Sequence, residues 1–231
     1  NQLHYENGRY TVDFEDFERK IVENQVKVFL LCNPHNPVGR VWTKEELECM
    51  GDICLRHHVI IMDDEIHCDF VYPGYHFTSF MTLDEKYQEN LVLYTSPSKT
   101  FNVAGLQVSN IFIANDSLRR RFVKEISAAG YSQVNASGLV ACRTAYAQGE
   151  EWYQGMMAYV RANIDFAEQY IREQIPEIRM RKPEGTYLLW LDFRRLSLTS
   201  EELEDLIVKK AGLWLDSGAI FGACGEGFQR I

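Results

Sequence analysis

The sequence predicts an α/β protein with a mostly parallel sheet between helices, followed by a smaller α+β domain. Short apolar runs rich in β-branched residues recur at residues 26–32, 59–63, 90–96 and 109–115. Helical patterns separate these runs along most of the first half of the chain. Because each run is apolar throughout, the strands are expected to be buried on both faces, as strands of parallel sheets are.

The helix after the first strand has the clearest start signal. Thr43 and Glu46 are three residues apart and form a capping box. One helix face then carries the side chains Leu47, Met50, Cys54 and His57. Further along the chain, residues 116–149 predict helices, with Asp116 as the N-cap.

A change of pattern near residue 152 predicts the domain boundary. A long helix follows it, with one apolar stripe formed by Tyr153, Met157, Val160, Ile164, Ala167, Ile171 and Ile175. Residues 177–193 predict two antiparallel strands around a Pro-Glu-Gly turn, and residues 199–212 predict a capped amphipathic helix. We therefore expect a large domain over 1–152 and a small α+β domain over 153–231.

Composition argues against several classes of function. The net charge is −9 and basic residues form no long runs, so nucleic acid and anionic membrane are not expected as main partners. No apolar stretch is long enough to span a bilayer. Six cysteines lie apart from one another and are expected to be reduced, as in a cytoplasmic protein. The first residue is not Met and the chain stops where a strand begins, so we expect part of a longer protein.

Polar residues directly follow three of the predicted strands. They are NPHNPVGR at 33–40, DDEIHCDF at 63–70 and TSPSKTF at 95–101. Each stretch alone has an ordinary explanation, namely a turn, a helix cap or structural ion pair, or a lysine that reaches solvent. However, the carboxyl ends of parallel strands share one edge of a sheet. Together the three stretches predict a pocket for a ligand with a cationic ring and a group that reacts with an amine.

Two other motifs have weaker support. Ser96 and Lys99 match the S-x-x-K motif of serine β-lactamases and penicillin-binding proteins, but the S-D-N and K-T-G motifs that accompany it are absent. The stretch GACGEG at 222–227 resembles a dinucleotide fingerprint, yet no βαβ unit surrounds it. The histidines lack metal-ligand spacing, so no metal site is expected.

The motifs NPHNPVGR, DDEIHCDF and SPSKTFNVAGLQ, in this order, resemble those of the class I and II aminotransferase superfamily of pyridoxal 5′-phosphate enzymes, which have fold type I. DEIHCDF with SPSKTFN is most similar to the bacterial C–S β-lyase branch, of the cystathionine β-lyase type. The resemblance covers all 231 residues. It implies pyridoxal phosphate as cofactor, an amino acid as substrate and a homodimer. It also implies that the large, cofactor-binding domain continues upstream and that the small domain continues slightly beyond Ile231.

The resemblance assigns roles to individual residues. Lys99 matches the lysine that forms the Schiff base with the cofactor and acts as the general base. Asp64 matches the carboxylate paired with the pyridine nitrogen, and Ser96 matches a hydroxyl on the cofactor phosphate. Asn36 matches the asparagine at the cofactor 3′-oxygen and belongs to the substrate site as well. Arg230 matches the arginine that binds the substrate α-carboxylate.

Two residues depart from the common aminotransferase pattern. His67 stands where many aminotransferases have a tyrosine at the cofactor 3′-oxygen, and Gln107 stands where many relatives have an arginine on the phosphate. Both departures favour the lyase branch. We therefore expect β-elimination of cystathionine or cysteine S-conjugates to a thiol, pyruvate and ammonia. An aminotransferase of the same superfamily is the alternative, and an inactive fragment or a regulatory protein-binding role is a further one.

Overall fold

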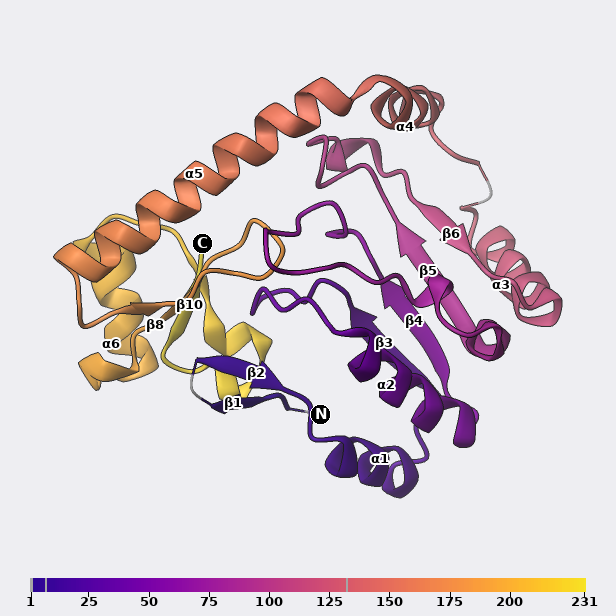
Figure 1. Cartoon of the computed structure of the whole chain (residues 1–231), viewed down its shortest axis with the longest axis horizontal. Coiled ribbons are helices and arrows are strands. Elements are labelled where there is room, and N and C mark those ends of the chain that lie inside the picture. Colours follow the sequence, from indigo (N-terminus) through magenta and orange to yellow (C-terminus); the bar gives the residue numbers. More distant parts are fainter. Residues whose placement is uncertain (1, 7, 132) are drawn as a thin grey trace.

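The computed structural model describes residues 2–6, 8–131 and 133–231, which form two four-stranded sheets and a hairpin (Figure 1). The first sheet contains β3 (Val28–Cys32), β4 (Ile60–Asp64), β5 (Leu91–Thr95) and β6 (Asn110–Phe112), in this order. The first three strands are parallel, whereas β6 pairs with β5 in the antiparallel sense. The predicted α/β fold with a mostly parallel sheet is confirmed.

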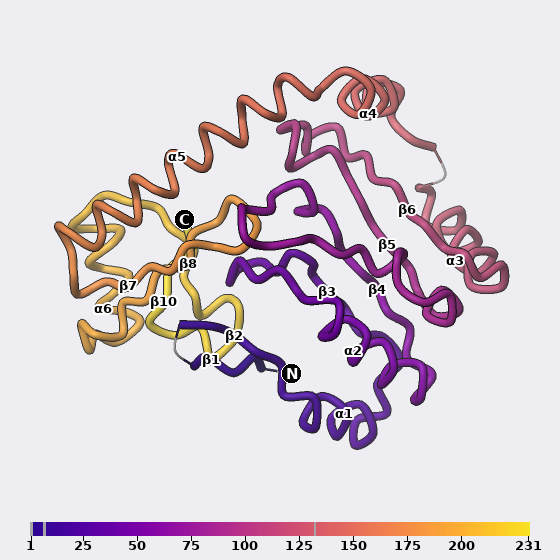
Figure 2. The backbone as a smooth tube through the Cα atoms, viewed as in Figure 1, coloured from indigo at the N-terminus to yellow at the C-terminus, as the bar shows by residue number. Residues whose placement is uncertain are grey.

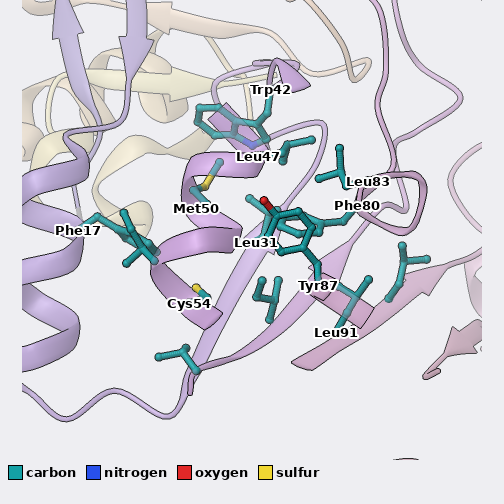
Figure 3. Packing of buried hydrophobic residues seen from close by; sticks show 14 of the residues in the cluster. Phe17, Leu31, Trp42, Leu47, Met50, Cys54, Phe80, Leu83, Tyr87 and Leu91 are labelled. Atoms are coloured by element: carbon teal, nitrogen blue, oxygen red, sulfur yellow. The ribbon is translucent and has the colours of Figure 1, made fainter. Parts of the chain in front are cut away.

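Helices α1 (Phe14–Glu23) and α2 (Lys44–Arg56) cover one face of this sheet. Helix α1 begins after Asp13, whose side chain accepts the Asp16 N–H, and α2 begins with the predicted capping box. Figure 3 shows the core that these elements share, with labelled side chains Phe17, Leu31, Trp42, Leu47, Met50, Cys54, Phe80, Leu83, Tyr87 and Leu91. This packing holds β3, β4 and β5 side by side.

On the opposite face of the sheet, the strand register aligns Leu30 with Met62 and Cys32 with Asp64. Leu30 is 74% exposed, and the Asp64 carboxylate is exposed as well. A cavity of about 360 Å³ lies here, lined by Leu30, Leu31, Cys32, Met62, Asp64 and Tyr94. In the described part of the chain, Asp64 therefore faces open space at the end of β4.

Three longer helices follow β6, namely α3 (Asp116–Ala128), α4 (Ala136–Gln148) and α5 (Glu150–Gln174). The prediction that Asp116 caps the first of them is wrong by one residue. Asn115 has an extended backbone, and its side chain accepts the N–H groups of Ser117 and Leu118 at 2.9 and 3.0 Å. Asp116 is instead the first helical residue, where its charge favours the helix dipole.

Helix α5 runs for 25 residues from α4 to the C-terminal unit (Figures 1 and 2). Its predicted apolar stripe is confirmed between 157 and 171, since these side chains pack on a second core that includes Leu191 and Leu203. The predicted boundary between residues 152 and 153 falls in the first turn of α5 and stays a prediction. No described helix is long and apolar enough to cross a membrane.

The C-terminal unit contains a fully antiparallel sheet in the order β7-β8-β10-β9. Its strands are β7 (Arg179–Met180), β8 (Trp190–Asp192), β9 (Asp216–Ser217) and β10 (Phe228–Arg230). The predicted capped helix is present as α6 (Ser200–Glu204), which continues as a π-helical turn over Asp205–Lys210. Short 3₁₀ turns lie at Phe80–Thr82, Glu85–Asn90, Ala104–Leu106, Arg194–Leu196, Gly218–Phe221 and Ala223–Gly225.

The N-terminal hairpin of β1 (His4–Glu6) and β2 (Arg9–Thr11) packs against this C-terminal sheet (Figure 1). The rings of Tyr5 and Phe228 meet edge to face at 5.9 Å, and Trp190 donates its indole N–H to the Tyr10 hydroxyl at 2.9 Å. The first described residues therefore lie beside the last ones, a contact between distant segments that no local pattern indicates.

Candidate active site

The loops that follow β3, β4 and β5 lie at one edge of the parallel sheet. Asn36, Asp64 and Lys99 belong to these three neighbouring strand ends. The Asn33 N–H donates to the Asp64 carbonyl at 3.0 Å, so the pairing of β3 with β4 extends into the loop. Figure 2 shows the loops pointing towards the C-terminal unit, where the chain ends. The prediction that these residues follow adjacent strands is confirmed.

Asp64 supplies a negative charge at the open face of the sheet. Its Oδ1 accepts the Ile66 N–H at 3.1 Å, which fixes the carboxylate at the strand end. Burial and the Asp64 charge both raise the pKa of the neighbouring Cys32 thiol, to about 11, and of the Tyr94 hydroxyl. These neighbours therefore stay neutral, and Asp64 is available to a cationic group.

Two further carboxyl groups flank Asp64 but point into the protein. Asp63 is fully buried, and Glu65 is buried with its Oε1 accepting the Phe80 N–H at 3.0 Å. Burial raises the pKa of both groups, and the nearby Glu65 raises that of Asp63 further. Asp63 and Glu65 are thus enclosed in the protein, and of the three carboxyl groups in the DDE motif only that of Asp64 is exposed to the site.

Lys99 extends from a turn that is anchored from two directions. The buried Thr100 donates its hydroxyl to Asp69 Oδ2 at 2.6 Å, and the Tyr153 hydroxyl from α5 donates to the Asp69 carbonyl at 2.8 Å. The backbone N–H of Phe101 closes the turn on the Pro97 carbonyl at 2.9 Å. Lys99 itself is exposed and has no ion-pair partner among the described residues, so its amine is free to react.

Ser96 is buried and takes part in the hydrogen bonds of the same loop. Its hydroxyl donates to the Val108 carbonyl at 2.7 Å and accepts the Ser98 N–H at 3.1 Å. In this arrangement Ser96 can offer a lone pair but not its hydrogen, so its role on a phosphate stays a prediction. The Val108 bond also fixes the segment that carries the exposed Gln107, which has a left-handed backbone with φ of 51°.

His67 is buried in the loop that follows β4. Burial, together with the positive charges of Lys99 and Arg230, lowers the pKa of His67 to about 4. Its ring is therefore neutral at physiological pH, and its Nδ1 has no hydrogen-bond partner among the described residues. An unpaired nitrogen in a buried place is costly unless a ligand satisfies it. Nδ1 has almost no exposed surface, so the described residues leave no open position for a ligand beside it.

Arg230 connects the C-terminal strand β10 to the loop after β3. Its Nη1 donates to Asn36 Oδ1 at 2.7 Å, although the two residues are 194 positions apart. Because Oδ1 is occupied, Asn36 presents its Nδ2 hydrogens to a ligand. The Asn36 backbone is held in turn by its N–H, which donates to Cys32 Sγ at 3.5 Å. The structure therefore brings Arg230 to Asn36, and His67 lies close enough to Lys99 and Arg230 for their charges to affect its pKa.

Tyr187 joins this group, and the sequence analysis does not identify it. Its ring lies 5.5 Å from that of His67 and 5.0 Å from that of Phe70. The preceding Thr186 is fully buried with φ of 68°, and its N–H donates to the Phe70 carbonyl at 2.9 Å. Positive φ is strained for a β-branched residue, and such strain is concentrated at functional sites. The Pro-Glu-Gly turn just before Tyr187 is the signal that could have directed attention to it.

The loop after β3 also fixes the C-terminal unit against the site. The Gly39 carbonyl accepts the N–H groups of Glu184 and Gly185 at 2.8 and 3.0 Å. Gly39 has φ of 69°, and a Cβ atom there would lie 2.6 Å from Pro183 Cβ. Only glycine suits both the backbone conformation and the close approach.

A buried ion network lies beside this contact. Arg40 donates through Nε to Glu184 at 3.0 Å and through Nη2 to both oxygens of Glu46 at 2.7 and 2.9 Å. Glu184 also accepts the Val41 N–H at 3.1 Å. The two units are therefore joined by charge as well as by backbone hydrogen bonds.

The model of the aminotransferase class I and II family matches residues 2–231. The chain belongs to this family. Membership explains why a lysine, an aspartate and an asparagine follow adjacent parallel strands, and it confirms the resemblance seen in the three motifs. The described residues hold no cluster of side chains suited to a metal ion.

Three proteins illustrate what this chain is similar to within the family. Cystathionine beta-lyase PatB of Bacillus subtilis is 38% identical over 231 residues, which is 100% of this chain and 60% of PatB. The pyridoxal-phosphate-bound putative aminotransferase of Clostridium difficile 630 is 44% identical with a TM-score of 0.95, covering 99% of this chain and 59% of that one. Cystalysin of Treponema denticola, which contains pyridoxal 5′-phosphate, is 39% identical with a TM-score of 0.96, covering 99% and 58%. The chain thus spans 58% to 60% of the length of these proteins.

Proposed function

We propose that the intact protein is a pyridoxal-phosphate-dependent C–S β-lyase that cleaves cystathionine or another cysteine S-conjugate to a thiol, pyruvate and ammonia. The observation that carries this proposal is the meeting of Lys99, Asp64, Asn36 and Arg230 at one edge of the parallel sheet. The similarity to a cystathionine β-lyase supports the reaction type.

The polar atoms of the site fit pyridoxal phosphate. The Asp64 carboxylate at the open cavity suits a protonated ring nitrogen. The Nδ2 hydrogens of Asn36 suit the oxygen on the ring. The Lys99 amine suits the carbonyl carbon of the cofactor. The assignment of Ser96 to the phosphate is the part of the proposal with the least support, since its hydrogen is used by Val108.

Pyridoxal phosphate, when bound, supplies an electron sink for the pair of electrons left at the substrate Cα. Asp64 would hold the protonated ring nitrogen of the cofactor, because each charge favours the charged form of the other. Arg230 binds the α-carboxylate through two N–H groups and thereby orients the bonds at Cα.

Lys99 takes the proton from Cα as the general base and returns a proton to the sulfur that leaves Cβ. The Cα–H and Cβ–S bonds break, the thiol leaves, and water hydrolyses the remaining enamine to pyruvate and ammonia. The neutral His67 contributes a hydrogen bond without adding a positive charge to the site.

An aminotransferase is the second candidate, because a structure 44% identical to this chain is named a putative aminotransferase. The same residues serve both reactions up to the removal of the α-proton. The two reactions differ in whether a group leaves Cβ.

Parallel assays of the intact protein, purified with pyridoxal phosphate, test the proposal. Pyruvate from L-cystathionine is followed with a coupled dehydrogenase, and amino transfer is followed with 2-oxoglutarate. We expect pyruvate release to be the faster process and Lys99→Ala to abolish both. Lys209→Ala is the control, since Lys209 forms an exposed ion pair with Asp205 far from the site. Steady transamination with no pyruvate from any thioether would assign the protein to the aminotransferases.

We also propose that the intact protein is a cytoplasmic homodimer. The family resemblance supports the dimer. The six free cysteines support a reducing compartment, where thiols persist. Sedimentation of the intact protein at micromolar concentration should give a dimer, and a monomer would contradict the proposed assembly.

A further inference from the structure

Arg230 is held on two edges and one face of its guanidinium group. Nε and Nη2 both donate to Oδ2 of Asp216, Nε at 3.1 Å, and Nη1 donates to Asn36 Oδ1 at 2.7 Å. The ring of Phe221 lies against the guanidinium carbon at 4.8 Å from its centroid. The plane of the group is therefore set before any ligand arrives.

The hydrogen bonds of Arg230 leave one opening for a ligand. A guanidinium group has five N–H donors, and three of them are used by Asp216 and Asn36. The two that remain are one on Nη1 and one on Nη2, and they share the outer edge of the group when Asn36 takes the Nη1 hydrogen on the Cδ side. Two N–H groups on neighbouring nitrogens match the two oxygens of a carboxylate. The side chain is 19% exposed, so a small molecule can reach it.

We propose that Asp216 is a positioning residue, which turns Arg230 so that its two remaining N–H groups receive the α-carboxylate of the substrate. This inference rests on the proposed function, because it deepens the role of Arg230 in binding an amino acid. Asp216 acts through Arg230 rather than on the reacting atoms.

The backbone supports this assignment of Asp216. Asp216 in β9 is the direct antiparallel partner of Arg230 in β10, and Ser217 is the partner of Gln229. Gln229 and Phe228 are buried, so β10 is fixed in the sheet. Opposite charges on directly paired residues of an antiparallel sheet lie close enough to interact. Strand pairing, rather than a chance contact of two long side chains, places the carboxylate beside Nε.

The negative charge of Asp216 also affects ligand binding, in the direction opposite to its positioning of Arg230, and the two effects have to be separated. Asp216 is negative, so its removal also lessens repulsion of an anionic substrate. A ligand pair that differs only in the carboxylate separates the two effects. L-alanine has no leaving group on Cβ, and ethylamine is alanine without its carboxylate.

The experiment follows the visible absorption of the intact, cofactor-loaded protein during titration with each ligand. Asp216→Ala should weaken L-alanine binding tenfold or more and leave ethylamine binding within twofold of wild type. Asp216→Asn keeps an oxygen acceptor at the same place and should hold L-alanine within threefold of wild type. Asp205→Ala, which removes an exposed carboxylate from its pair with Lys209, is the matched control and should change neither ligand.

Asp216→Ser replaces Asp216→Ala if the latter does not fold, since the shorter side chain does not reach Arg230. L-alanine affinity within twofold of wild type in either variant would overturn the inference. An equal loss for L-alanine and ethylamine would overturn it as well, because the effect would then not concern the carboxylate. If wild type does not respond to L-alanine, the proposed function fails too, whereas a wild type that binds L-alanine, together with an Asp216 variant that binds it equally well, contradicts only the role of Asp216.

Discussion

Two arginines connect the loop after β3 with the C-terminal unit, and they do so in different ways. Arg40 reaches out from the loop to Glu184, and Arg230 reaches back from β10 to Asn36 in the same loop. The Arg40 side chain is 3% exposed and pairs with two carboxylates, of Glu184 and Glu46. The Arg230 side chain is 19% exposed, with one carboxylate and one amide as partners.

The difference separates a buried structural arginine from one that we propose to bind the substrate. The positive charge of Arg40 is neutralised twice, and its side chain is almost fully buried. Arg230 keeps two donors and access to solvent. Each arginine lies beside a histidine with a lowered pKa of about 4, His35 near Arg40 and His67 near Arg230. The role of an arginine at this contact is therefore indicated by how many of its N–H groups are already hydrogen-bonded. Its presence alone does not indicate a role.

The largest expected effect is the loss of stability when Arg40 is replaced. Arg40→Met leaves the buried Glu184 without its main cation, so we expect the free energy of unfolding to fall by about 3–5 kcal/mol. Urea denaturation of the intact protein measures this. The control is Arg172→Met, which removes an exposed helical pair with Glu168 and should cost less than about 0.5 kcal/mol. A loss of under about 1 kcal/mol at Arg40 would mean that the buried network does not hold the two units together.

Arg230→Met should change stability little and weaken ligand binding strongly. We expect the free energy of unfolding to change by less than about 1 kcal/mol, since the pair with Asp216 is partly exposed. The affinity for L-alanine should fall by about a hundredfold, as expected for the loss of a two-point charged contact. Titration and urea denaturation of the same preparation give both values. Destabilisation as large as that of Arg40→Met would assign Arg230 a structural role and remove the contrast.

The histidines predict how stability depends on pH. In the unfolded chain they take up a proton near pH 6.5, whereas in the fold they do so only near pH 4. The unfolded state therefore binds more protons between these values, and the free energy of unfolding falls as pH drops from 6.5 towards 4. Each histidine should account for about 2 kcal/mol between pH 7.5 and 5.

Comparing the pH dependence of stability in His67→Gln and in wild type tests the contribution of His67. Its loss of stability between pH 7.5 and 5, measured by urea denaturation, should be smaller than that of wild type by about 2 kcal/mol. Carboxyl groups such as Asp63 titrate in both proteins, so their contribution cancels in the difference. Identical pH profiles would show that His67 is not held neutral by burial and by its cationic neighbours.

The smallest expected effect concerns Tyr187, whose ring lies beside that of His67. Tyr187→Ala removes the ring from the site and should raise KM for L-cystathionine about fivefold, in line with the value of one aromatic contact. Tyr187→Phe keeps the ring and should stay within about twofold of wild type. Steady-state kinetics on the intact protein distinguish the two. An equal effect of both substitutions would assign the role to the hydroxyl instead of the ring.

The sequence predicts the half of the site that follows parallel strands. Apolar runs identify β3, β4 and β5, and parallel pairing then aligns their ends, so Asn36, Asp64 and Lys99 follow from local pattern and topology. The roles of these residues came from the resemblance to a family, because no local pattern distinguishes Asp64 from Asp63. The structure separates the two by exposure.

The other half depends on contacts between distant segments. Asp216 meets Arg230 only because β9 pairs with β10, and Tyr187 enters the site only because Thr186 is held in a strained conformation. The hairpin that contains Tyr5 returns to the C-terminal sheet across almost the whole chain. Pairing of short strands carries little signal in a single sequence, since each strand is only two or three residues long.

Helix α5 connects the two halves of the site, the one that follows the parallel strands and the one in the C-terminal unit. At a rise of about 1.5 Å per residue its 25 residues measure about 37 Å. It begins just after Gly149, where an added Cβ would lie 2.3 Å from the ring of Phe101, two positions after Lys99. Its other end packs through Ile171 on the core beneath β8, the neighbour of β10. The same helix therefore contacts both the segment after Lys99 and the core beneath the strand beside β10, so it links the two segments that carry Lys99 and Arg230.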